Sequence, residues 1–376
     1  MGEMEQALEA LVAISSPSGD IEAAERTVSV CEGRLPPEAA VERLQCSSPG
    51  HAQDLLARLA GSGRARILLL GHLDTVFAHG DHVELQRDGQ RWRGSGTVDM
   101  KGGVALALAL MGWLAARPEL FAELALLLVV DEEWRLAPFA HVTRFEAFDA
   151  CLCFEAGEQS ETGEERVIVR RKAAGTLEVT ARGRAAHAGS NPDSGANALL
   201  ALADAATAAA ALHDPGGPAG LSVVPSRIAS GGAINVVPAD GTLMVDVRAN
   251  SEAAFGEVIR AIPASSHGAA LDVQLIRSWP GMDSRAACAE LLGAASRRLG
   301  RPVLAGSRGG ASDASHFAGS IELTIDGLGP RGGRAHAPEE YVNARSFPER
   351  LELAMALCEV MPGVLNRSPG AAAART

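Results

Sequence analysis

Residues with the chemistry of metal ligands stand where an apolar run ends. Residues 67–71 are apolar or glycine, and His72 and Asp74 follow them, separated by one position. Positions i and i+2 of a strand lie on the same face, and ligand sites of open α/β sheets lie at the carboxyl ends of strands. An imidazole beside a carboxylate is the usual pairing of a metal-ligating histidine with the group that orients it. On its own, the stretch fits equally well a strand that runs into a polar turn.

The same pattern recurs further along the chain. Asp99 follows a glycine-containing loop, Glu132 and Glu133 follow an apolar run at 123–130, and Glu155 follows another at 150–154. A later loop, after residues 321–325, carries His336. Taken singly, each acidic residue could be a turn former, and Asp99 could be a helix N-cap.

Together, these side chains indicate a metal centre. Carboxylates at neighbouring strand ends converge and raise one another's pKa, so a cluster of them favours bound cations. Two histidines and at least three carboxylates, without cysteine, suit a pair of Zn²⁺ ions, or Co²⁺ or Mn²⁺. One ligand must be shared, and each ion then takes one histidine and one further carboxylate. One carboxylate remains as a general base.

Alternating strands and helices must position these residues. Apolar strands at 67–73, 123–130 and 150–154 alternate with a long apolar helix at 100–116, which predicts a mostly parallel sheet covered on both faces. We also expect helices at 3–15 and 284–299, and a strand at 41–46. The last helix is expected to begin at Ser346, with Glu349 completing a capping box.

The pattern of apolar and polar residues changes near residue 173, from continuous apolar runs to alternating segments. Alternating segments at 176–181, 222–230 and 242–248, a strand at 271–276, and helices at 196–212 and 252–262 indicate a separate α+β unit. We therefore predict a catalytic domain in two parts, 1–173 and 281–367, interrupted by an inserted domain at 174–280. The low-complexity residues 368–376 are expected to be a disordered tail.

Length, charge and cysteine content narrow the functional classes. The 376 residues carry a net charge of −12 and are 47% hydrophobic, which favours two folded domains and argues against nucleic-acid binding. The sequence shows no signal peptide, and no run approaches a membrane span. Six cysteines without framework spacing predict free thiols and a cytoplasmic protein, with Cys151 and Cys153 in the core.

At this point the sequence resembles the M20 metallopeptidases, the group of glutamate carboxypeptidases, acetylornithine deacetylases and succinyl-diaminopimelate desuccinylases. The resemblance covers nearly the whole chain and rests on eight motifs in family order. They are Gly71-His72-Leu73-Asp74-Thr75-Val76, Gly94-x-Gly96-x-x-Asp99-Met100-Lys101-Gly102-Gly103, Asp131-Glu132-Glu133, Phe154-Glu155, Gly183-x-x-x-His187-Ala188-Gly189, Asn235-Val236-Val237-Pro238 with Asp246-x-Arg248, Gly309-Gly310-x-Ser312-Asp313, and His336-Ala337-Pro338-x-Glu340-Tyr341-Val342.

The resemblance implies an α/β zinc-peptidase domain with an inserted lid that also forms a homodimer interface. It implies that His72 and Glu155 hold one zinc, that Glu133 and His336 hold the other, and that Asp99 bridges the two ions.

It also implies roles for residues outside the ligand set. Asp74 would orient His72, and Glu132 would be the general base. His187 would stabilise the oxyanion, from its own chain or across the dimer. Asn235, Arg248, Gly309 and Gly310 would bind the substrate.

The resemblance implies hydrolysis of an amide bond beside a free carboxylate, in an N-acyl amino acid or a small peptide. N-acetyl- or N-succinyl-diamino-acid deacylation and dipeptide hydrolysis are alternatives within the fold, and a binding protein without turnover is an alternative outside it. A phosphate-binding role for the glycine loops is disfavoured, because neither ends in Gly-Lys-Ser/Thr. The family usually has a small residue where Trp134 stands, followed here by Arg135, and we expect both to alter the pocket wall.

Overall fold

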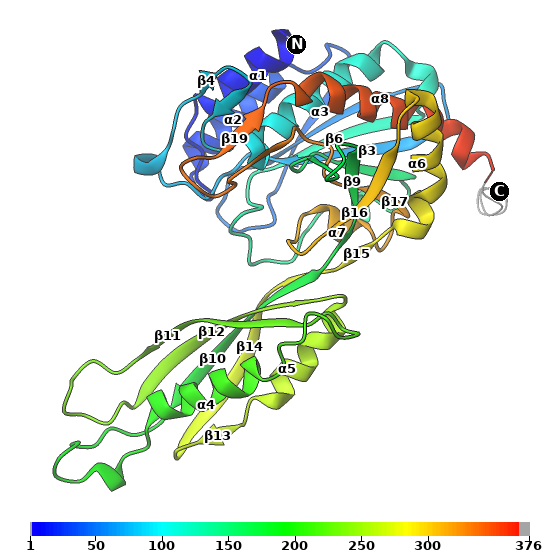
Figure 1. Ribbon diagram of the computed structural model, residues 1–376. Coiled ribbons are helices and arrows are strands. Elements are labelled where there is room, and N and C mark those ends of the chain that lie inside the picture. Colours follow the sequence, from blue (N-terminus) through cyan, green and yellow to red (C-terminus); the bar gives the residue numbers. More distant parts are fainter. Residues whose placement is uncertain (1, 368–376) are drawn as a thin grey trace. The chain divides into compact units, whose positions relative to one another are not determined.

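The computed structural model describes residues 2–367 and divides into two compact units, shown in Figure 1. The second unit comprises Arg171–Gly281 together with Arg308–Ala311, and the first unit comprises the rest of the described chain. The predicted tail at 368–376 lies outside the described residues.

The first unit is built on a six-stranded sheet. Its strands lie in the order β1 (Ala40–Leu44), β2 (Asp54–Ala60), β6 (Glu123–Val129), β3 (Arg66–His72), β7 (Ala150–Cys153) and β17 (Leu323–Ile325). β3 runs parallel to both β6 and β7, and β17 runs parallel to β7. β1 and β2 form an antiparallel edge. The prediction of a mostly parallel sheet is confirmed.

Both faces of this sheet are buried, as its apolar strands require. Ile67 and Leu69 belong to one core cluster, and Leu68 and Leu70 belong to the other. The first cluster also contains residues from the long helices of this unit. They are α1 (Gly2–Val12), α2 (Ile21–Glu32), α3 (Gly102–Ala115), α6 (Arg285–Leu299) and α8 (Ser346–Leu365). The short helix α7 (Ala314–Phe317) contributes to the second cluster. Burial on both faces therefore fixes the strand ends that carry the polar residues.

One expectation about α3 needs correction. The stretch Thr97–Ala115 is long and apolar enough to cross a membrane, with a mean hydropathy of 1.4, although no such run was expected. The sequence obscures it because Asp99 and Lys101 interrupt the apolar residues at its start. Since 72% of that stretch is buried inside the protein, it is a core helix packed against the sheet.

The start of α8 differs from the predicted capping box. Ser346 is already inside the helix, and the N-cap residue before it, Arg345, makes no capping hydrogen bond with its side chain. The Ser346 hydroxyl instead accepts the backbone N–H of Arg331 at 2.9 Å, and Glu349 pairs with the Arg331 guanidinium. Ser346 and Glu349 therefore bind the loop that contains Arg331, and they do not cap the start of the helix.

Two smaller sheets complete the first unit. β5 (Arg91–Arg93) pairs with β4 (Gln86–Asp88) and with β19 (Tyr341–Asn343), which also pairs with β18 (Gly332–Gly333). A second small sheet is formed by β15 (Met282–Asp283), β9 (Glu165–Arg171) and β16 (Val303–Arg308), with β8 (Glu158–Gln159) beside β9. The sheet around β5 brings the loop before Asp99 next to the loop that carries His336.

The second unit has an antiparallel sheet with helices packed on it. The strand order is β11 (Ser222–Ser230), β12 (Asp240–Ala249), β10 (Ala173–Arg182), β14 (Ala269–Trp279) and β13 (Ser265–Ser266). Alternate residues of β10 and β12 are buried, in a core cluster shared with α4 (Ala198–Ala210) and α5 (Phe255–Ala261). The unit therefore has a core of its own, as an α+β domain needs.

Candidate metal centre and active site

His72 occupies the last position of β3, and its ring is buried. Its Nδ1 atom lies 3.3 Å from Oδ1 of Asp74 and 3.1 Å from the Asp74 carbonyl oxygen. Its Nε2 atom lies 3.1 Å from Oδ1 of Asp99 and 3.7 Å from Oε1 of Glu155. One ring nitrogen thus faces an orienting residue, and the other faces two carboxylates from neighbouring segments.

His336 forms a second group of the same kind. Its Nε2 atom lies 3.1 Å from Oδ2 of Asp99 and 3.2 Å from Oε2 of Glu133. The His336 backbone is in the left-handed region, with φ of 63°. The ring is half-exposed, in contrast to the buried ring of His72.

Asp99 belongs to both groups. The possible ligand atoms of His72, Asp99 and Glu155 lie within 4.8 Å of one another, as do those of Asp99, Glu133 and His336. The two oxygens of Asp99 face different histidines, Oδ1 toward His72 and Oδ2 toward His336. Each group has one imidazole nitrogen and two carboxylates, a donor set that suits Zn²⁺, Co²⁺ or Mn²⁺.

The charges of the cluster fit cations. Hydrogen bonds that His336 donates to Asp99 and Glu133 raise its pKa to about 11. Burial lowers the pKa of His72, but hydrogen bonds with Asp74 and Asp99 outweigh it and raise the pKa well above its usual value. The carboxylates thus favour positive charge at the rings of His72 and His336. Divalent cations bound by these carboxylates and ring nitrogens would provide that positive charge.

Asp74 also holds the segment that follows β6. Its Oδ1 and Oδ2 atoms accept the backbone N–H groups of Glu132 and Glu133 at 3.1 and 3.0 Å. Burial raises the pKa of Glu132 well above its usual value, and the negative charges of Asp313 and Glu133 raise it further against the opposing charge of His72. A carboxylate that takes up protons this readily beside a ligand cluster suits proton transfer.

Trp134 and Arg135 follow this segment, and the structure shows surroundings for them that the sequence did not reveal. Arg135 is fully buried, forms an ion pair with Asp131 at 3.1 Å, and pairs with Asp313. Its guanidinium is thus held between two carboxylates inside the protein, and the expected effect of its charge on the pocket wall stays a prediction. Trp134 is 64% exposed, so its bulk does lie at the surface beside Glu133.

The remaining predicted site residues lie in the second unit. His187 is exposed, and its Nδ1 atom accepts the backbone N–H groups of Gly189 and Ser190, both at 3.1 Å. With Nδ1 engaged as an acceptor, a neutral ring carries its proton on Nε2. The backbone of Asn235 lies beside this loop, because its carbonyl accepts the N–H of Ala188 at 2.9 Å.

Arg248 and the two glycines have partners or surroundings within the same unit. The guanidinium of Arg248 forms a two-pronged pair with Asp246, with Nε–Oδ1 at 2.9 Å and Nη2–Oδ2 at 2.8 Å. Gly309 and Gly310 are exposed, and the carbonyl of Gly310 accepts Nη1 of Arg171 at 2.8 Å. A substrate carboxylate at Arg248 would therefore compete with Asp246.

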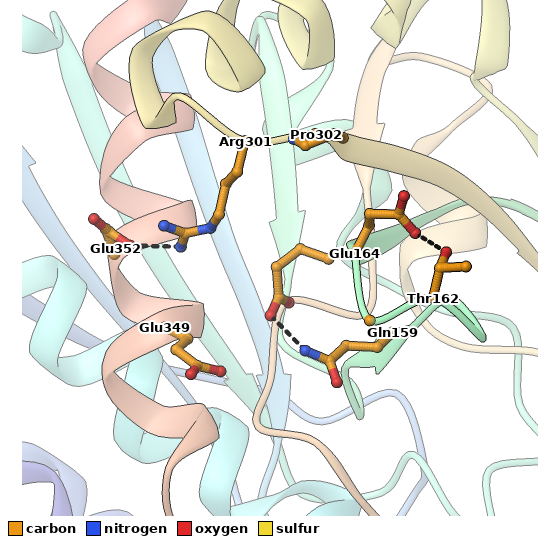
Figure 2. A pocket seen from close by; sticks show the side chains of 9 residues that line it. Gln159, Thr162, Glu164, Arg301, Pro302, Glu349 and Glu352 are labelled. Carbon is orange, nitrogen blue, oxygen red and sulfur yellow. Dashed lines mark hydrogen bonds and ion pairs between the residues drawn. The ribbon is translucent and has the colours of Figure 1, made fainter.

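A pocket of about 380 Å³ elsewhere in the first unit is acidic, and its carboxylates have partners (Figure 2). Arg301 is directed at Glu352, and Thr162 bonds to Glu164. Glu349 pairs with Arg331, as described above. These contacts make the pocket an ion-pair network rather than a site for chemistry.

A third group of possible ligands, Cys46, Asp54 and Asp131, is buried. Asp54 accepts the N–H of Val130 at 3.0 Å and lies 2.7 Å from Nε2 of His141. Asp131 is engaged by Arg135 and by the N–H of Ser48 at 2.9 Å. Because its oxygens already accept internal hydrogen bonds, this group is a structural polar cluster.

Comparison with known proteins identifies the class. A model of peptidase family M20/M25/M40 matches residues 68–360. The chain belongs to this family, and the M20 resemblance of the sequence is thereby confirmed, as is its assignment as a hydrolase. Family members are generally metal-dependent, which agrees with the ligand groups around Asp99.

Individual relatives are moderately similar. The chain is 26% identical to carboxypeptidase G2 of Pseudomonas sp. over 368 residues, covering 93% of this chain and 87% of the relative. It is 30% identical to a succinyl-diaminopimelate desuccinylase of Methylorubrum extorquens, covering 80% of this chain and 84% of the relative. Among solved structures, aminopeptidase PepT of Bacillus cereus superposes with a TM-score of 0.75 at 19% identity, covering 95% of this chain and 98% of that chain. The last comparison supports the fold alone.

Proposed function

We propose that the protein is a two-zinc hydrolase that cleaves an amide bond adjacent to a free carboxylate. Asp99 carries this proposal, since its two oxygens face two histidines in separate ligand groups. In this assignment His72 and Glu155 hold one ion and Glu133 and His336 hold the other. Co²⁺ or Mn²⁺ could replace Zn²⁺ with the same donor set.

The chain's own residues would handle the proton. A pair of bound cations lowers the pKa of water and stabilises negative charge on a carbonyl oxygen. Glu132, whose raised pKa favours proton uptake, would take the proton from the attacking water and deliver it to the leaving amine. Asp74 would keep both Glu132 and the ring of His72 in place through the bonds described above.

Second-unit residues would recognise the substrate. The Nε2–H of His187 is the donor that would stabilise the oxyanion. Arg248 would grip the free carboxylate in fork geometry, exchanging Asp246 for the substrate. Asn235 and the backbone of Gly309 and Gly310 would also bind the substrate.

The substrate class rests on the relatives. Carboxypeptidase G2 matches this chain over 93% of its length, which favours a small peptide or N-acyl amino acid with a terminal carboxylate. The desuccinylase relatives support the alternative of an N-acyl diamino acid. Dipeptide hydrolysis is a further alternative, and the intact Glu132 argues against a binding protein without turnover.

A substrate panel with matched pairs tests the proposal. We would measure hydrolysis of N-acyl amino acids and of the same compounds with the carboxylate converted to an amide, before and after chelation. We expect cleavage of the free acids only, loss of activity on chelation, and recovery with Zn²⁺ or Co²⁺. Equal cleavage of acids and amides, or activity that survives complete metal removal, would overturn the proposal.

We further infer that the second unit is the lid and the dimer interface. Its edge strand β11 exposes Val224 and Ile228, and α4 exposes Leu199 and Leu200. An edge strand of nine residues that exposes two large apolar side chains favours pairing with a second copy. Light scattering of wild type against Val224→Lys tests it: a dimer is expected for wild type, and a monomeric wild type would refute the interface. A cytoplasmic location is consistent with six free, buried cysteines.

A further inference from the structure

Glu340 is a buried glutamate that bonds only to backbone among the hydrogen bonds described for its carboxylate. It is 1% exposed. Its Oε1 atom accepts the backbone N–H groups of Val98 at 2.8 Å and Asp99 at 3.0 Å, and Oε2 accepts the N–H of Gly96 at 2.9 Å. One carboxylate thus binds three N–H groups of the segment that carries the shared ligand.

The position of Glu340 in the chain joins this segment to the other ligand loop. Glu340 lies four residues after His336 and immediately before β19. Its backbone carbonyl accepts the N–H of Gly94 at 3.1 Å, and β19 pairs with β5 just upstream of that glycine. Glu340 therefore contacts the Asp99 segment through both its main chain and its side chain.

The Asp99 segment needs such support because its backbone is irregular. Asp99 and Met100 have φ of −127° and −130°, outside the helical region, so α3 begins only at Gly102. The N–H groups of residues 96, 98 and 99 are thus available to a side-chain acceptor, and charge-assisted bonds to a carboxylate are stronger than neutral ones.

We propose that Glu340 is a positioning residue that fixes residues 96–99 so that each oxygen of Asp99 faces its own histidine. The same contact ties the position of Asp99 to the loop that carries His336. The proposal rests on the metal centre of the proposed function and adds a residue outside its ligand set. Loss of the contact should lower the affinity for both metal ions, because Asp99 is shared between them. Loss of His336 should lower the affinity for one ion only.

Glu340→Gln provides the test, since it keeps the size of the side chain but replaces one acceptor oxygen with an NH₂ donor. Zn²⁺ affinity of the full-length protein would be measured by competition with a chromophoric chelator, together with the Tm of the metal-free protein. We expect affinity for both ions to fall about 10- to 100-fold, the usual effect of losing a group that orients a ligand. Glu340→Asp, which keeps the charge, serves if the first variant does not fold.

Glu165→Gln is the matched control, because Glu165 is also a buried glutamate of the first unit but pairs with Arg331 and Arg350. It should lower Tm while leaving Zn²⁺ affinity unchanged. If both Glu340 variants lower Tm but bind two Zn²⁺ as tightly as wild type, the residue is structural only and the proposal is overturned. A wild type that binds two Zn²⁺ without hydrolysing amides would refute the proposed function while leaving this test intact.

Discussion

Oδ1 of Asp74 accepts the backbone N–H of Glu132 at 3.1 Å. Asp74 therefore contacts the segment of the proposed general base as well as the ring of His72. This carboxylate is buried, and burial opposes its ionisation, but bonds with His72 and with backbone N–H groups outweigh burial and lower its pKa. An ionised Asp74 therefore holds the ring of His72, a proposed metal ligand, and the backbone of Glu132, the proposed base, at fixed positions.

Replacing Asp74 by Asn should disturb both contacts. An amide cannot accept hydrogen bonds at both positions, so one of the N–H groups of Glu132 and Glu133 loses its acceptor. We expect metal affinity and kcat/KM to fall about 10- to 100-fold. Asp283→Asn is the control, since Asp283 is exposed and pairs with Arg285. Wild-type values for both properties in Asp74→Asn would show that the contact is dispensable.

His187→Ala should lower kcat with little change in KM. A donor that acts on the developing oxyanion is worth about 10²- to 10³-fold in kcat. Steady-state kinetics would check this, with His267→Ala as a control on an exposed histidine of the same unit. A rise in KM at constant kcat would instead make His187 a substrate-binding residue.

Arg248→Lys should affect substrates according to their carboxylate. Lysine keeps the charge but lacks the planar fork, so KM for free-acid substrates should rise about tenfold or more while kcat changes little. For substrates with the carboxylate amidated, wild type and variant should be equally poor. The same loss on acids and amides would mean that Arg248 acts through Asp246 on the fold rather than on the substrate.

His316 predicts a stability change with pH. Burial, together with the positive charge of Arg135, lowers the pKa of His316 to about 3. The unfolded chain takes up this proton near pH 6.5 and the folded chain does not, so stability is full above pH 6.5 and falls as the pH drops toward 3. The loss is at most about 1.4 kcal/mol per pH unit.

Urea unfolding of wild type and His316→Gln between pH 7 and 4.5 would measure this contribution. The variant lacks the titrating ring, so the stability difference between the two proteins should shrink as the pH falls. Parallel pH profiles would show that His316 titrates normally in the folded protein.

Much of the parallel sheet was readable in the sequence because its strands are short, apolar and bounded by turns. β2 was missed, since Asp54–Ala60 consists largely of leucine, alanine and arginine, which favour helices in isolation. It is a strand because it lies between β1 and β6 in the sheet, a tertiary contact that local propensity does not encode.

The site divides in a similar way. His72, Asp99, Glu133, Glu155 and His336 could be singled out because each stands at a strand end or in a family motif, and their roles stay predictions. The contacts that hold them could not be anticipated. Glu340 bonds residues more than 240 positions earlier, and Arg135 reaches Asp313 across 178 positions. Contacts between residues so far apart in the chain leave no periodic pattern in the sequence.

The most direct test of the account is Glu132→Gln, with hydrolysis and bound metal measured on the same preparation. Glutamine cannot take up the proton but leaves the ligands His72, Asp99 and Glu133 in place. We expect close to two ions per chain in wild type and variant, and a fall in kcat of about 10²- to 10⁴-fold in the variant. A variant that keeps its metal and hydrolyses the substrate at the wild-type rate would contradict it.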